Sequence, residues 1–184
     1  MFSSVIALVL LPLVWGAPDP TKVCAPDVFQ FFSYNIETDG SAQIAIDFKQ
    51  KLLTSASPNQ TVVQDFVKLK SYTFDASGNC QSANILPEQF YPQCLPARST
   101  YIGEVFIGFG PNRVPAEAWE TPYFGGTLRA AVSHQPGEPR YAVLVKFVNA
   151  QGIPFTNFCS NPTLNITVPN AFKIPDPCPP ATIG

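Results

Sequence analysis

The sequence predicts a mainly β protein, built as an antiparallel sandwich or partly closed barrel and cross-linked by disulfides. Three observations support this prediction. The 20 prolines and 11 glycines are spread through all 184 residues and leave little room for long helices. Several of the segments between them alternate apolar and polar residues, as half-buried strands do. Five cysteines follow an apolar leader, and exported chains use cysteines mainly in disulfides.

The predicted strands follow one another with turn-forming residues between them. They cover residues 41–49, 62–74, 99–109, 127–133, 140–149 and 164–168. Residues 75–79 predict a turn and residues 134–139 a hairpin-type connection, because Gly, Pro, Asp and Asn gather there. Residues 175–184 are too rich in proline for a regular element. No repeat and no linker divides residues 17–184, which predicts a single domain.

Residues 1–16 have the pattern of a secretory signal peptide. An apolar run covers residues 5–11, and Val14 and Gly16 occupy the −3 and −1 positions of a cleavage site. The lack of a Lys or Arg before the run departs from the usual pattern. The alternatives are a buried N-terminal strand and a membrane anchor, but the run is shorter than the roughly 20 residues that span a bilayer. We therefore expect a secreted, extracellular protein that does not span a membrane.

The composition bears on partners and on surface modification. The chain is 46% hydrophobic and only 13% charged, with a net charge of −2. Such a chain has no basic patch for nucleic acid. Its surface needs hydroxyls, amides and sugars to stay wetted. Two sequons, Asn59-Gln60-Thr61 and Asn165-Ile166-Thr167, predict N-linked glycans at Asn59 and Asn165.

The cysteine count is odd. The five are Cys24, Cys80, Cys94, Cys159 and Cys178. One of them must therefore be free, buried or joined to another chain. No CxxC or HxxxH spacing occurs, which argues against a zinc site.

The sequence predicts neither an enzyme nor a bound cofactor. His134 is the only histidine and lies in a turn, where no nucleophile is positioned to use it as a base. The chain contains no GxSxG elbow and no Gly-Lys-Ser phosphate loop, and its carboxylates are scattered. Asp75 and Asn79 could offer oxygen ligands to Ca²⁺. A plain turn is the better interpretation of these two residues, because Asp and Asn are favoured there anyway.

The aromatic content leaves two interpretations open. The 15 phenylalanines and six tyrosines suit an ordinary β core, and they equally suit an apolar cavity that holds a lipid. The side chains expected to form the core or line such a pocket are Ile44, Ile46, Phe48, Val143, Val145 and Phe147.

Several segments together resemble the ependymin-related proteins. Near the N-terminus stands Cys24-Ala25-Pro26, and Tyr72-Thr73-Phe74-Asp75 precedes Cys80. The middle of the chain carries Ser99-Thr100, Ile107-Gly108, Trp119-Glu120 and a strand that ends at Val132. The closing residues 168–178 place a phenylalanine before prolines and a final cysteine. The resemblance covers nearly all of residues 17–184, through the order and spacing of these segments.

The resemblance implies two curved antiparallel sheets, akin to bacterial lipoprotein carriers, around a deep hydrophobic pocket. It implies a secreted glycoprotein, often dimeric, with links to lipid, extracellular matrix and calcium. Cys80 and Cys178 match positions that the family pairs with each other. The family's partner for Cys24 is missing. Either Cys94 pairs with Cys159 and leaves Cys24 free to link a homodimer, or one of them captures Cys24.

The leading hypothesis is a carrier of a hydrophobic or amphipathic ligand, such as a lipid or fatty acid. The alternative is an extracellular matrix or adhesive protein, for which glycans, an odd cysteine and low charge would be suitable.

Overall fold

The computed structural model describes residues 17–180, and the predicted signal peptide, residues 1–16, lies outside them. The described part is mainly β, as predicted. Its strands are β1 (Val28–Asn35), β2 (Gly40–Asp47), β3 (Leu52–Ala56), β4 (Thr61–Asp65), β5 (Lys70–Phe74), β6 (Cys80–Asn84), β7 (Thr100–Ile107), β8 (Val114–Tyr123), β9 (Gly126–Ser133), β10 (Ala142–Val148) and β11 (Pro154–Thr163). Its three short 3₁₀ helices are η1 (Pro20–Lys22), η2 (Pro87–Gln89) and η3 (Gly110–Asn112). Within residues 17–180, no helix has the length and apolarity that a membrane crossing requires.

All of these strands belong to one antiparallel sheet, whereas the resemblance implied two. The strand order is β6-β5-β4-β3-β2-β1-β11-β10-β9-β8-β7. Strands β1 to β6 form one meander, which we call the N-terminal meander, and β7 to β11 form the C-terminal meander. The two meet where β1 pairs with β11, so that Tyr34 lies opposite Phe158. This pairing makes one open sheet out of two consecutive sets of strands.

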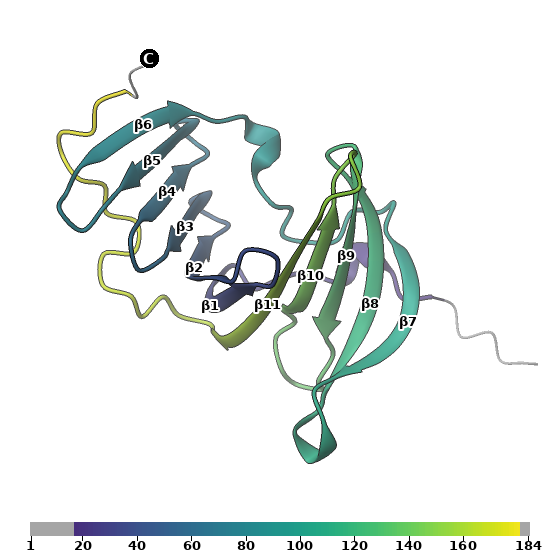
Figure 1. Ribbon diagram of the computed structural model, residues 1–184. Helices are drawn as coiled ribbons and strands as arrows, with labels where there is room; N and C mark the ends of the chain where they lie inside the picture. Colours follow the sequence, from purple (N-terminus) through teal and green to yellow (C-terminus); the bar gives the residue numbers. More distant parts are fainter. Residues whose placement is uncertain (1–16, 181–184) are drawn as a thin grey trace, which may run out of the picture.

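The sheet bends at this junction. Figure 1 shows β2 to β6 on one side and β7 to β10 on the other, with β1 and β11 between them. Because β6 and β7 lie at opposite edges, residues 85–99 must cross from one meander to the other.

The structure confirms four of the predicted strands, which correspond to β2, β7, β9 and β10. Residues 134–139 connect the antiparallel neighbours β9 and β10, as predicted. The prediction of one strand over residues 62–74 is wrong. The chain turns between β4 and β5, and Leu69 adopts a positive φ of 54° there. Val67 lies in this turn and is 70% exposed.

The predicted strand over residues 164–168 is also wrong, because the last strand is β11 and ends at Thr163. Residues 164–180 instead cross the outer face of the N-terminal meander (Figure 1). The Gln30 carboxamide exchanges hydrogen bonds with Thr167, and the Thr54 hydroxyl donates to the Ala171 carbonyl at 2.7 Å. A cross-strand row is buried beneath this tail, formed by Gln30, Ala45, Thr54 and Val63. The tail therefore gives this half of the sheet a second covered face.

Two disulfides fix the irregular segments. Cys80 of β6 bonds to Cys178 of the tail, the pair that the resemblance implied. Cys24 bonds to Cys94, which joins the N-terminal segment to the crossing segment 85–99. Cys94 has therefore captured Cys24, and the alternative of a Cys94–Cys159 pair is wrong. Cys159 is the free cysteine of the described chain, and it is buried.

Candidate ligand pocket

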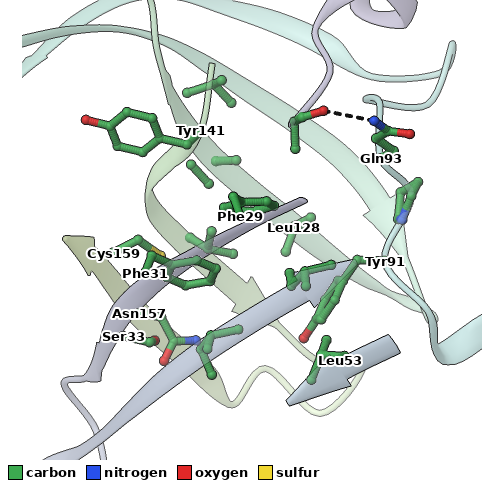
Figure 2. A pocket seen from close by; sticks show the side chains of 18 of the residues that line it. Phe29, Phe31, Ser33, Leu53, Tyr91, Gln93, Leu128, Tyr141, Asn157 and Cys159 are labelled. Atoms are coloured by element: carbon green, nitrogen blue, oxygen red, sulfur yellow. Dashed lines mark hydrogen bonds between the residues drawn. The ribbon is translucent and has the colours of Figure 1, made fainter. Parts of the chain in front are cut away.

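A pocket of about 650 Å³ lies between the two meanders. This volume falls in the range of about 300–1,000 Å³ that is typical of small-molecule sites. Its wall is drawn from both meanders, from the N-terminal segment and from the crossing segment. Figure 2 shows Phe29 and Phe31 of β1 at its centre, with Tyr91 facing them.

The N-terminal meander supplies an apolar floor. Alternate residues of a strand face the same side, which brings Phe29 and Phe31 of β1 to the pocket with their rings stacked 5.4 Å apart. Ile46 lies opposite Phe29 in the β1–β2 ladder, and Leu53 lies opposite Ile46 in the next ladder. All but Phe31 are buried, in one cluster with Phe66. The floor is thus a cross-strand row of large apolar side chains, the arrangement that stabilises a sheet face most.

The C-terminal meander supplies a more mixed wall. Leu128, Ala130 and Val132 alternate along β9 and all line the pocket. Thr121 and Tyr123 alternate along β8 and line it as well. Val132 also packs with Val23 and Trp119 in a second buried hydrophobic cluster.

The crossing segment joins the two walls through adjacent aromatic residues. Phe90 packs against Phe48 and Phe66, with ring centroids 5.6 and 4.7 Å apart, and so belongs to the floor. Tyr91 stacks on Tyr123 of the opposite wall at 6.3 Å. The Cys24–Cys94 disulfide and a 2.8 Å hydrogen bond from Ala25 N–H to the Gln93 carbonyl hold the segment in place.

Charge is scarce in the pocket. Arg140 is the only charged side chain among the described residues that line it. Its guanidinium donates to a Glu117 carboxylate oxygen at 2.9 Å and to His134 Nδ1 at 2.8 Å. Since the Glu117 side chain is only 6% exposed, its carboxylate depends on Arg140 for compensation. The positive charge of Arg140 is thus already paired within the protein.

Two hydroxyls of the pocket wall have no partner. Thr121 Oγ1 and Tyr123 Oη are shielded from water and make no hydrogen bond to any described residue. Burial raises the pKa of Tyr123 to about 12, with a smaller contribution from Tyr91. Burial likewise raises the pKa of Tyr91, whose hydroxyl points into the pocket in Figure 2. These hydroxyls therefore remain protonated and uncharged at neutral pH.

Cys159 of β11 contributes the free thiol to the pocket wall. Burial raises its pKa to about 12. A thiol with this pKa is protonated at neutral pH and is a poor nucleophile, since the thiolate is the reactive form. The geometry therefore assigns it a packing role.

The structure places only some of the six side chains predicted for the core or pocket in the pocket lining. Ile44, Ile46, Phe48 and Val145 line the pocket, whereas Val143 and Phe147 do not. An extra residue in β10, between Ala142 and Leu144, shifts the register against β9. This bulge, which breaks strict alternation, brings Ala142 to the pocket. Val143 is buried at the bulge, and Phe147 packs against Tyr123 at 6.1 Å.

The other predicted sites are placed as follows. Asn59 and Asn165 are both exposed. The Asp75 carboxylate accepts hydrogen bonds within its own turn, from Asn79 Nδ2 at 2.8 Å and from two backbone N–H groups. The Asn79 side chain, first among these donors, lowers the pKa of Asp75. Within residues 17–180 no group of three or more His, Cys, Asp or Glu side chains could hold a metal ion. Calcium binding stays a prediction.

Sequence reasoning missed several of the pocket residues. Strand β1 was not predicted, because Phe29, Phe31 and Phe32 place aromatic residues on both of its faces and hide the alternation. Tyr91 lies outside any strand, so no periodicity marks it. Thr121 and Tyr123 follow Trp119 at every second position of β8, a pattern that could have been found.

No protein-family model matches this chain, and no curated protein matches it either.

Proposed function

We propose that the protein is a secreted, ependymin-like glycoprotein that carries a hydrophobic or amphipathic ligand, such as a lipid, in this pocket. The observation that supports the proposal is the volume of about 650 Å³ between an apolar floor and a mixed wall. A ligand that fills the pocket would remove the apolar side chains of its lining from water, which is favourable.

The apolar floor is suited to an acyl chain or a comparable hydrocarbon body. Burial contributes about 0.8 kcal/mol per methylene group. Roughly ten buried methylenes would supply about 8 kcal/mol, which corresponds to micromolar affinity before the cost of ordering the ligand.

The matrix or adhesive alternative depended in part on an odd cysteine. The free cysteine is Cys159, which is buried in the pocket wall. Cys24, which was expected to be able to link two chains, is bonded to Cys94. The prediction of a dimer linked through Cys24 is therefore wrong. The alternative function gains no specific support and stays a prediction.

The first test is native mass spectrometry of the secreted protein, followed by organic extraction and lipid analysis. We expect an apolar or amphipathic molecule to copurify in stoichiometric amount. A protein that copurifies with no ligand and does not bind alkanes, fatty alcohols, fatty acids or lysolipids would refute the proposal.

A variant pair then tests whether the pocket is the site. Ala42 of β2 lines the pocket, so Ala42→Phe places a ring inside it. The neighbouring Gln43 projects from the opposite face of β2 and does not line the pocket, so Gln43→Phe is the matched control. We expect Ala42→Phe to lose ligand binding and Gln43→Phe to keep it. Equal binding by both variants would place the ligand elsewhere.

A further inference from the structure

We propose that the ligand has an uncharged, hydrogen-bonding head group, which pairs with the hydroxyls of Thr121 and Tyr123 on β8. This inference rests on the proposed carrier function and names the ligand class within it. The class comprises long-chain alcohols, esters and other neutral amphiphiles, as opposed to bare hydrocarbons or fatty acid carboxylates.

The first support is the state of Thr121. Its side chain lies on the pocket-lining face of β8, and the residue is only 3% exposed. Its hydroxyl oxygen has no hydrogen-bond partner among the described residues. Buried hydroxyls are nearly always paired, and an unpaired one costs free energy. The unpaired Thr121 hydroxyl therefore identifies a position where a polar group of a ligand could form a hydrogen bond.

The second support is the position of Tyr123. It lies two residues from Thr121 on the same face, and its hydroxyl is also buried and unpaired. A third unpaired hydroxyl, that of Ser99, belongs to a residue outside the pocket lining. Both residues line the same wall of the pocket, and each hydroxyl can donate and accept, so polar groups of a ligand could satisfy them.

Access to these oxygens requires movement of a side chain that packs against them. Both oxygens are shielded from water, so a ligand must displace side-chain atoms to reach them. The Tyr91 ring stacks on Tyr123, and the residue is 49% exposed on the irregular crossing segment. Like Phe124, the other half-exposed ring packed against Tyr123, it has room to move toward solvent.

The absence of free charge in the described lining selects an uncharged head group. Arg140 is the one cationic side chain there, and Glu117 already neutralises it. A ligand carboxylate that took Arg140 would leave the buried Glu117 carboxylate unpaired, which is strongly unfavourable. A neutral head group avoids this exchange.

The apolar part of the ligand would then lie over the opposite wall. Phe29, Ile46 and Leu53 form the continuous apolar row there, while the orphan hydroxyls lie on β8. The pocket therefore has a polar side and an apolar side, as an amphiphile requires.

The test compares four probes of one chain length: an n-alkane, the n-alkanol, the methyl ester of the fatty acid, and the fatty acid at neutral pH. Affinities are measured by displacement of one fluorescent fatty-acyl reporter. We expect the alkanol and the ester to bind about tenfold more tightly than the alkane, which corresponds to one or two net hydrogen bonds. We expect the fatty acid to bind more weakly than the alkanol.

The variants Thr121→Val and Tyr123→Phe remove one hydroxyl each and change little else. Each should weaken the alkanol about tenfold and leave alkane affinity unchanged. Retained alkane affinity also reports that the variant is folded. Tyr141→Phe is the matched control, because Tyr141 lines the pocket but its hydroxyl points away from it in Figure 2. It should alter no affinity.

The outcomes separate the two proposals. If all four probes bind equally and the β8 variants change nothing, the head-group inference is overturned and the carrier function stands. If the fatty acid binds most tightly, Arg140 binds the carboxylate of the ligand and the inference is again overturned. If no probe binds the native protein, the carrier function itself fails.

Discussion

Glu117 and Arg140 form a hydrogen-bonded ion pair of 2.9 Å at the edge of the pocket. Glu117 comes from β8 and Arg140 from the residues just before β10, so the pair spans the strand between them. The same carboxylate accepts from Trp119 Nε1 at 3.3 Å and lies 3.5 Å from His134 Nδ1. One arginine thus compensates a nearly buried negative charge.

Removal of Arg140 should therefore destabilise the protein far more than removal of both partners. We expect Arg140→Met to lower the free energy of unfolding by about 3 kcal/mol, because the Glu117 carboxylate stays buried and unpaired. The double variant with Glu117→Met should recover most of this loss. Urea unfolding at neutral pH measures both. Equal stability of the single and double variants would show that the pair has no such role.

Gly126 is expected to tolerate no side chain. A Cβ at this position would lie 2.2 Å from the Val148 carbonyl oxygen and 2.9 Å from Phe147 Cε2. Because backbone must move to make space, Gly126→Ala should cost about 2 kcal/mol or more in thermal or urea unfolding. Gly40→Ala is the control, since its Cβ would meet only the Thr38 hydroxyl at 3.1 Å. A Gly126→Ala variant as stable as that control would contradict the packing described.

Cys159 should resist thiol reagents in the folded protein. Its pKa of about 12 compares with 9.0 for an ordinary cysteine, so the thiolate fraction at pH 8 is lower by on the order of a thousandfold. We expect slow labelling of the native chain and rapid labelling of one thiol in urea. The labelling rate of the native protein should keep rising above pH 9, where the labelling rate of the unfolded protein levels off. Cys159→Ala should abolish the signal, and rapid native labelling would show the thiol to be exposed.

Both sequons should carry glycans when the protein is made through a secretory pathway. Asn59 and Asn165 are exposed and leave room for a sugar. We expect N-glycosidase treatment to lower the mass, and Asn59→Gln and Asn165→Gln to remove one glycan each. Asn161→Gln is the control, because Pro162 follows it and excludes modification. A mass unaffected by the glycosidase would contradict the prediction of N-linked glycans.

Local periodicity predicted one pocket wall well. Ile44, Ile46 and Phe48 share a face of β2, and all three line the pocket. Their neighbours Ala45 and Asp47 lie on the opposite face of the strand, and both are also buried, Ala45 beneath the tail. A tail that lies far away in sequence decides whether that face is covered, and no local pattern reports it.

The remaining differences also arise from non-local or backbone features. The single sheet depends on the pairing of β1 with β11, which lie at opposite ends of the chain. The bulge at Val143 inserts one residue into β10 and changes which side chains of that strand reach the pocket. The two orphan hydroxyls on β8 could not be predicted, because an unpaired hydroxyl is defined only by its surroundings.

The pairing of β1 with β11 has a consequence for synthesis on the ribosome. Every ladder of the N-terminal meander joins consecutive strands and can close as the nascent chain emerges. One edge of β1 stays unpaired until β11 has been made, and an unpaired strand edge can hydrogen-bond to other chains. Cys80 must likewise wait for Cys178, while Cys24 and Cys94 are already available to each other. If an external oxidant joined Cys80 to either of them first, the resulting non-native disulfide would trap the nascent protein.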